Sequence, residues 1–292
     1  MVKQHPPLAY GLEGPVGCTG LVVRLFGRLE LCWGSDPLPA PQSPIARSLL
    51  AYLIIRGRQS TSRDTLAGVF WPERSDSAAR KALSQSLWQI RGALDPAGSR
   101  LETDLDLVTI ALQPDDWFDV AAFEEILQRW ERLLVGGAFP APVLPECLMD
   151  LNLALEHYRG DLVEDCYDDW IVPYRERLRE RTLWVLEKLI LLNKLWGDHH
   201  QALAHAQRLA TADPLRESVH RELMRLYHIL GRDRAALKQY SNLCWLLEKE
   251  LGDKPAAATT ALYQELLAAE NEPAAALMPL TARSACRAIL RP

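Results

Sequence analysis

The sequence predicts a mainly α-helical protein in which a small α+β domain precedes an all-α domain of helical repeats. Two observations carry this prediction. One spacing of apolar residues and glycine recurs in the C-terminal half, whereas strand-like and helical segments alternate only in the N-terminal third. A chain of 292 residues also has room for about two domains.

The repeat has the period of a tetratricopeptide (TPR) unit, which is 34 residues. The first copy contains Leu189, Leu192, Gly197, Ala202, Leu203 and Leu209, and the second contains Leu223, Leu226, Gly231, Ala236, Leu237 and Leu243. One such helix–turn–helix unit cannot bury its apolar face alone, so units stack into an array whose groove commonly binds other proteins. The repeat therefore predicts an interaction module.

Composition places the chain among ordinary soluble proteins, with 48% hydrophobic and 24% charged residues. The net charge of −5 carries no global nucleic-acid signature, so any DNA-binding surface has to be local. The cysteines are scattered, which favours free thiols in a reducing cytoplasm. Residues 1–20 read as a flexible N-terminal segment without a signal peptide, and the absence of a long apolar run predicts no membrane span. We expect a cytoplasmic protein.

The first third begins with two predicted strands, over residues 21–26 and 29–33, followed by turn residues 34–37. A helix then starts at an Ser43 N-cap with Pro44 in its first position, and Gly57 ends it. A second helix follows an Ser62 N-cap and stops before Pro72.

A third, longer helix is predicted over residues 77–94. Its apolar positions fall at steps of three and four, which gives one buried face: Ala79, Leu83, Leu87, Ile90 and Leu94. Residues 101–112 have strand-like flanks and a polar centre, which predicts a hairpin. Strands, three helices and a closing hairpin are the order of a winged helix-turn-helix, here over residues 21–113.

The opposite face of the third helix is the candidate DNA-binding site. It comprises Arg80, Lys81, Ser84, Gln85, Trp88 and Arg91. A helix fits the major groove of B-DNA, where the cations contact phosphate or guanine, Gln85 reads adenine, and Trp88 packs on a sugar or a thymine methyl group. The alternative is a solvated basic helix face, with Trp88 covering the core.

The remainder, residues 114–270, is predicted to be helical. An amphipathic helix runs over 123–134, residues 136–146 form a Pro- and Gly-rich connection, and a last helix spans about 257–270. Residues 271–292 have weak periodicity and are expected to form a loosely ordered tail. Six aromatic residues are expected mostly to pack in this helical core: Trp170, Trp184, Trp196, Tyr227, Tyr240 and Trp245.

Several segments together resemble the SARP-type bacterial transcriptional regulators. Residues 46–53 (ARSLLAYL), 62–66 (SRDTL) with 70–72 (FWP), and 79–94 are similar to the three helices of that family's OmpR-like winged helix. Residues 116–123 (DWFDVAAF), 158–162 (YRGDL) and 176–178 (ERL) are similar to its bacterial transcriptional activator domain, BTAD. The resemblance implies a DNA-binding regulator, expected to be an activator, whose TPR-like domain supports dimerisation and contacts RNA polymerase or another regulator.

Three departures from the family pattern weaken the predicted DNA contact. Ser84 and Gln89 stand where relatives tend to carry arginine, and Asp104 and Asp106 are expected at the tip of the wing, with Arg100 as a nearby cation. Residues 20–122 hold 11 Lys and Arg against 12 Asp and Glu, a net charge of −1. We therefore expect weak binding by a monomer, strengthened by a homodimer on repeated half-sites.

These departures also support an alternative function, a protein-interaction or signalling module whose winged helix no longer binds DNA. An enzyme is not predicted, because no nucleophile–base pair and no P-loop occur and no cofactor is implied. His199, His200 and His205 are expected to be solvent-exposed residues around an inter-helix turn, because no Cys or acidic ligand lies at metal-site spacing. No metal is predicted.

Overall fold

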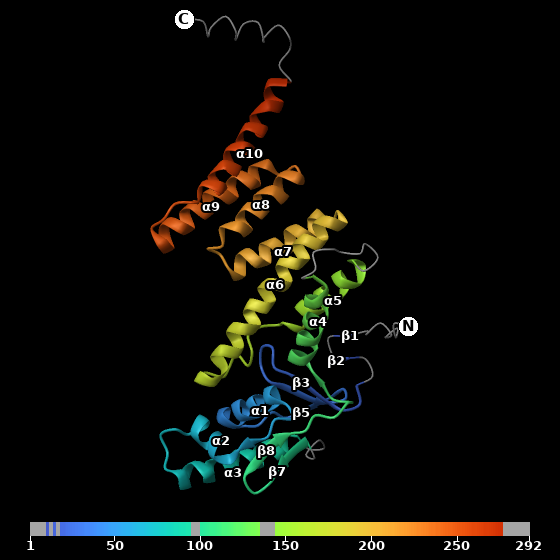
Figure 1. The fold of residues 1–292 in the computed structure, drawn as a ribbon, viewed down its shortest axis with the longest axis vertical. Helices are drawn as coiled ribbons and strands as arrows, with labels where there is room; N and C mark the ends of the chain where they lie inside the picture. The colour runs from blue at the N-terminus through green and yellow to red at the C-terminus, as the bar shows by residue number, and fades with distance from the viewer. Residues whose placement is uncertain (1–9, 12–13, 16–17, 95–99, 135–143, 277–292) are drawn as a thin grey trace, which may run out of the picture. The chain divides into compact units, whose positions relative to one another are not determined.

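The structure, a computed structural model, describes residues 10–11, 14–15, 18–94, 100–134 and 144–276 (Figure 1). The chain divides into two compact units, Met1–Val185 and Leu186–Pro292. This division falls inside a helix rather than near residue 113, so the expected domain ranges, 21–113 and 114–270, remain a prediction.

A four-stranded sheet forms the centre of the first unit, with the strand order β5-β4-β3-β9. β3 (Leu21–Arg24) and β4 (Glu30–Trp33) form the antiparallel pair expected from the sequence. β5 (Asp36–Leu38) lies where a turn was expected, and it pairs with β4. β9 (Trp117–Phe118) adds to β3 in parallel, so the chain returns to this sheet after the winged helix is complete.

Three helices follow, each within one residue of its predicted boundaries. α1 (Pro44–Arg56) has Ser43 at its N-cap and ends at Gly57, whose φ of 59° is an angle that glycine adopts without steric strain. α2 (Arg63–Phe70) is capped by Ser62, whose hydroxyl accepts a hydrogen bond from the Thr65 amide. α3 (Asp76–Ala93) packs on both α1 and α2.

A second, three-stranded sheet forms the wing. β7 (Leu101–Thr103) and β8 (Leu107–Ile110) are the expected hairpin, and β6 (Thr61–Ser62) pairs with β8 just before α2. Arg63 at the start of α2 also donates its amide to the Asp106 carbonyl at 2.8 Å. The wing is thereby fixed to the start of α2 by backbone hydrogen bonds.

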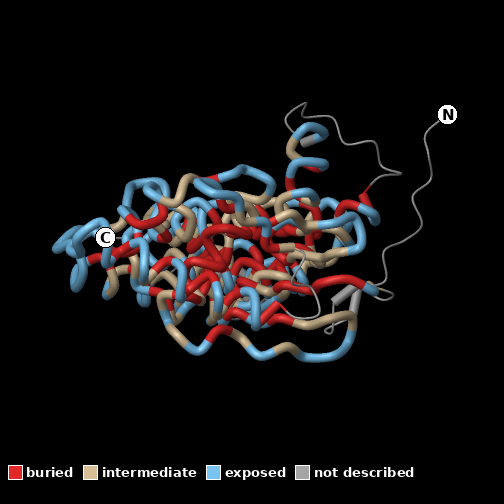
Figure 2. The backbone as a smooth tube through the Cα atoms, turned by 90° about the horizontal axis from the view of Figure 1, so that it is seen from below, coloured by how far each residue is buried: buried red, intermediate tan, exposed pale blue. Residues whose placement is uncertain are grey.

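The rest of the first unit consists of α4 (Asp119–Leu134), α5 (Leu144–His157), a 3₁₀ turn over Asp169–Ile171 and the start of α6 (Val172–Trp196). Phe123, Leu127 and Trp130 of α4 are fully buried. Figure 2 shows the buried stretches in the interior and the exposed ones outside.

The second unit contains the end of α6, then α7 (His199–Ala212), α8 (Glu217–Ile229), α9 (Asp233–Leu251) and α10 (Ala257–Ala276). The predicted repeat is present: α6–α7 and α8–α9 are two helix–turn–helix pairs. Gly197 and Gly231 occupy the same turn position, with φ of 87° and 68°. Ten of the twelve repeat residues, all except these glycines, are apolar, and those buried include Leu189, Leu223 and Leu226.

The structure changes several expectations at the ends of the chain. Within the expected flexible segment 1–20, β1 (Tyr10–Gly11) and β2 (Gly14–Pro15) pair antiparallel. α10 extends past the expected end at residue 270 to Ala276, and residues 277–292 of the expected tail lie outside the described residues. None of the helices described here is long and apolar enough to cross a membrane.

Some side chains of the second unit also differ from their predicted environments. Tyr227 and Tyr240 are partly buried against the core of α8, α9 and α10, as expected. Trp196 and Trp245, expected to pack in the core, are 57% and 63% exposed. His205, expected in solvent, is buried on the inner face of α7, where desolvation lowers its pKa to about 4.

Candidate nucleic-acid interface

Helix α3 presents two faces of opposite character. Its inner face, formed by Ala79, Leu83, Leu87 and Ile90, is at most 5% exposed and packs against α1 and α2. Burial of these apolar side chains fixes the rotation of the helix, because turning it would expose them to water. The opposite face is therefore held outward by the core. It carries every residue of the predicted DNA-binding site: Arg80, Lys81, Ser84, Gln85, Trp88 and Arg91, all of which are exposed.

Trp88 lies in the middle of this outer face and is 75% exposed. This exposure contradicts the alternative interpretation, in which Trp88 covers the core. Among the described residues, no ring or cation stacks on its indole. Single exposed apolar side chains are common on protein surfaces, so the role of Trp88 has to be argued from the residues that lie beside it.

Arg80 is bonded to the preceding helix. Its Nε and Nη2 atoms lie 3.1 and 2.9 Å from Oδ1 of Asp64 on α2, and both side chains are mostly solvent-exposed. The Ser84 hydroxyl donates to the Arg80 carbonyl at 2.9 Å. An exposed ion pair of this kind contributes at most about 1 kcal/mol. The Arg80 side chain can therefore leave Asp64 for another partner at a small cost in free energy.

Arg91, at the other end of the outer face, is bonded to the wing. Its Nη2 donates to the Thr103 hydroxyl at 2.9 Å, where β7 ends. Lys81 is the cation of this face that makes neither a hydrogen bond nor an ion pair through its side chain within the described part of the chain. The outer face of α3 thus offers one cation without a partner, Lys81, near its start, and an amide, Gln85, and an aromatic ring, Trp88, in its centre.

Gln89, one of the expected departures from the family pattern, has a structural role that the sequence did not reveal. Its Oε1 accepts a hydrogen bond from the Ser43 backbone amide at 3.1 Å. Ser43 is the N-cap of α1, and its own side chain makes no capping bond. Gln89 thereby ties the start of α1 to α3, which is a contact between helices and leaves no sequence signal.

The tip of the wing is acidic, as predicted. Asp104, Leu105 and Asp106 form the turn between β7 and β8, and Leu105 is 89% exposed. The Asp104 carboxylate accepts the Leu105 amide at 2.8 Å, which stabilises the turn. Two carboxylates beside an exposed leucine repel a phosphate backbone, and such a tip suits contact with protein better than contact with DNA.

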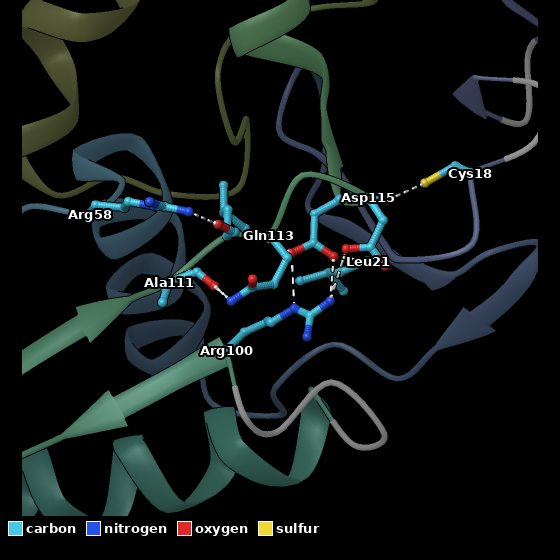
Figure 3. A network of polar contacts seen from close by, with 9 residues as sticks. Cys18, Leu21, Arg58, Arg100, Ala111, Gln113 and Asp115 are labelled. Carbon is cyan, nitrogen blue, oxygen red and sulfur yellow. Dashed lines mark hydrogen bonds and ion pairs between the residues drawn. The ribbon is translucent and has the colours of Figure 1, made fainter.

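Arg100, expected to balance the acidic tip, lies instead at the base of the wing. Figure 3 shows its guanidinium pointing toward the segment that follows the wing. Its Nε lies 2.9 Å from Oδ2 of Asp116, and its Nη2 lies 3.4 Å from Oδ1 of Asp115. The Asp116 side chain is 1% exposed and also accepts the Leu21 amide at 2.7 Å, so this cluster joins the wing to β3. The expectation that Arg100 serves the wing tip is wrong.

The winged helix is also bonded to the helices that follow it. Asp119, at the start of α4, is buried, and its carboxylate accepts the backbone amides of Leu25 and Phe26 at 2.9–3.0 Å. Desolvation raises the pKa of Asp119 to about 6, against the opposite effect of these hydrogen bonds. On α1, the buried Ser48 hydroxyl bonds to Asp168 and accepts the Trp170 indole N–H at 3.0 Å.

In the second unit, a pocket of about 240 Å³ lies between α6, α7 and α8. Its walls include the apolar residues Ile190, Leu191, Leu209 and Val219. Both acidic residues of the pocket form ion pairs. Oε1 of Glu222 lies 2.5 Å from Nζ of Lys194, and the Glu187 carboxylate pairs with the Arg216 guanidinium. The repeat thus provides an apolar pocket with a neutralised rim, of a kind that accepts a side chain of a partner.

The architecture defines a class of protein in which a winged helix is joined to TPR-like helical repeats. The family model described as "Bacterial transcriptional activator domain" (BTAD) matches residues 118–267, and the chain belongs to this family. The match confirms the resemblance to SARP-type regulators that the sequence indicated.

Curated relatives agree with this assignment. Regulatory protein AfsR of Streptomyces coelicolor is 27% identical over 290 residues, which cover 99% of this chain and 27% of AfsR. Transcriptional regulatory protein MoaR1 of Mycobacterium tuberculosis is 27% identical, over 84% of this chain and 78% of MoaR1. The chain therefore spans about a quarter of AfsR but most of MoaR1. These relatives are transcriptional regulators by name.

A solved structure shows the same fold. Mycobacterium tuberculosis EmbR, in complex with a low-affinity phosphopeptide, superposes with a TM-score of 0.69 at 22% sequence identity. The superposition covers 85% of this chain and 65% of the EmbR chain. At this identity the likeness concerns the fold, which is mainly α with an N-terminal winged helix.

Proposed function

We propose that this chain is a DNA-binding transcriptional activator that places α3 in the major groove. The observation that carries the proposal is the outer face of α3, where all six predicted residues are exposed while the opposite face is buried. Arg80, Lys81 and Arg91 contact phosphate or guanine, and Ser84 and Gln85 reach base edges. Membership of the BTAD family, together with regulators among the relatives, supports this function.

Binding by a single copy is weak in this proposal. The domain has no excess of positive charge, Arg80 and Arg91 have partners within the protein, and the wing tip is acidic. Since phosphate contacts supply most of the non-specific affinity for DNA, few free cations mean a low affinity for each half-site. A homodimer on repeated half-sites raises the affinity without new contacts at either site.

The test is a fluorescence-anisotropy titration of the protein on fragmented genomic DNA from its source, at low and at physiological salt. We expect sequence-preferring binding that weakens as salt rises. Replacing Arg80 and Lys81 together by alanine weakens binding and flattens its salt dependence. Absence of sequence-preferring binding at either salt concentration rejects the proposal.

We further propose that the TPR-like unit contacts RNA polymerase or another regulator. The pocket between α6 and α8, with its paired rim charges, supports a protein partner. Light scattering with and without an operator fragment measures dimerisation, and pull-down with purified RNA polymerase measures the second contact. Leu191→Glu, at the pocket edge, is expected to weaken the polymerase contact and to leave DNA binding unchanged.

The second candidate function is a protein-interaction module without DNA binding. The observation that favours it is the wing tip, where Leu105 is almost fully exposed between two carboxylates. It predicts a stable protein partner whose binding is unaffected by alanine at Arg80 and Lys81. The same double variant therefore separates the two functions, because only the first requires these cations.

A further inference from the structure

The centre of the outer face of α3 is apolar and neutral rather than cationic. Trp88 is 75% exposed, and Gln85 precedes it by three residues, so both project from the same side of the helix. The flanking arginines are bonded to Asp64 on α2 and Thr103 on the wing. A helix that bound DNA mainly through charge would present several free cations here, whereas Lys81, four residues before Gln85, is the one cation of this face without a partner among the described residues.

Base edges in the major groove differ in the partners that they accept. Guanine offers two acceptors to Arg or Lys, adenine offers an acceptor and a donor to an amide, and thymine offers its C5 methyl group to an apolar side chain. Gln85 supplies the amide, and the Trp88 indole supplies the apolar surface. Both side chains therefore match an A·T base pair.

We propose that Trp88 packs on thymine methyl groups and that, with Gln85, it makes α3 a reader of A·T base pairs. This inference rests on the proposed function, since it assumes that α3 enters the major groove. In this proposal, apolar contact contributes most of the binding free energy at the base pairs in the centre of the half-site. The binding affinity contributed by these base pairs consequently depends more on the thymine methyl group than on the salt concentration.

Uracil tests the proposal because it lacks the thymine methyl group and keeps the same hydrogen-bonding atoms. Two pools of duplexes with the same randomised core are prepared, one with thymine and one with uracil in its place. Sequences selected from the first pool are then measured in both forms by anisotropy. We expect about fourfold weaker binding for each contacted methyl group that is removed, the change expected for burying one methyl group.

Two variants assign the effect to the indole. Trp88→Ala is expected to bind more weakly than the wild type and to bind the thymine and uracil forms equally, whereas Trp88→Phe keeps part of the discrimination. Trp245→Ala is the matched control, because that tryptophan is 63% exposed on α9 in the other compact unit. It is expected to discriminate as the wild type does. Circular dichroism melting checks that each variant is folded.

The outcomes are distinct. Two results would show that Trp88 does not contact thymine methyl groups: equal affinity of the wild type for both forms, or discrimination that survives in Trp88→Ala. Either result leaves the proposed DNA-binding function in place. Binding to neither pool rejects the proposed function and this inference together. If Trp88→Ala leaves DNA affinity unchanged and abolishes capture of a purified protein partner, the indole belongs to a protein interface, and the inference is wrong.

Discussion

Two of the three cations on the outer face of α3 are bonded to neighbouring elements, and one of these bonds pairs the cation with a carboxylate. The bonds differ in their consequences. Arg80 pairs with a carboxylate that competes directly with phosphate, whereas Arg91 donates to the neutral Thr103 hydroxyl and keeps its full charge. In the proposed DNA contact, Asp64 is thus the carboxylate that competes with phosphate for Arg80.

Replacing Asp64 by asparagine is expected to strengthen DNA binding. The change releases Arg80, and an exposed pair contributes up to about 1 kcal/mol, so the affinity rises by up to about fivefold. The salt dependence also steepens, since one more cation displaces counterions. Anisotropy titrations over a salt series measure both effects. Asp36→Asn, on β5, removes a charge that forms no ion pair with any of the described residues, and an equal gain from this control would contradict the explanation.

Arg100 shows the opposite case, a charge whose role is structural. Arg100→Gln leaves the buried Asp116 carboxylate without its counter-charge, and such losses destabilise proteins by about 3 kcal/mol. Urea denaturation measures the change. The matched control is Arg58→Gln, because Arg58 makes one exposed hydrogen bond to the Leu112 carbonyl and is expected to change stability by less than about 1 kcal/mol. Similar losses in both variants would show that the cluster has no special importance.

At the scale of elements, helices were predicted well because their periodicity is local. Apolar residues at steps of three and four predicted the bounds of α3 to within one residue, and they also predicted its buried face. Ser62 as an N-cap predicted the start of α2. The two-residue strands β6 and β9 were missed, because they are too short to show alternation and exist through pairing with distant segments. For the same reason, the contact of Gln89 with Ser43 was not predictable.

α7 provides an element-scale prediction of pH dependence. Burial among the apolar residues of the repeat, together with Arg208 nearby, lowers the pKa of His205 to about 4, against an unfolded value near 6.5. Between these values the unfolded chain binds more protons, so the stability present above pH 6.5 is lost as the pH falls toward 4. The folded repeat therefore favours the neutral form of His205.

His205→Leu removes this titration. Relative to the wild type, its unfolding free energy is expected to improve steadily as the pH falls from about 6.5 to about 4, and to differ by a constant amount above pH 7. Urea denaturation at several pH values gives the two curves. His200→Leu, at an exposed position on the same helix, is the control and keeps the wild-type slope. Parallel curves for the wild type and His205→Leu would contradict the assignment.

At the scale of the whole molecule, the winged helix shares a compact unit with the helices that follow it. Segments far apart in the chain meet there: Phe26 packs on Phe123 and Tyr158, and backbone bonds join Gly27 to Asp161 and Val163 to Leu25. The sequence indicated both parts but not this union, because family resemblance marks each part separately. The proposed DNA-contacting helix α3 and the helices that follow the winged helix are consequently connected through one core.

This union predicts that the winged helix does not fold independently at the boundary that the sequence suggested. A fragment of residues 1–113 lacks Asp119, so the buried amides of Leu25 and Phe26 lose their acceptor, at about 1–3 kcal/mol each. It also exposes the Phe26 ring. We expect it to melt without cooperativity or well below residues 1–196, which end with α6, when both are followed by circular dichroism. A fragment 1–113 as stable as the fragment 1–196 would show that the shared core contributes nothing to the stability of the winged helix. Asp119→Ala in the full chain tests the same contact without truncation.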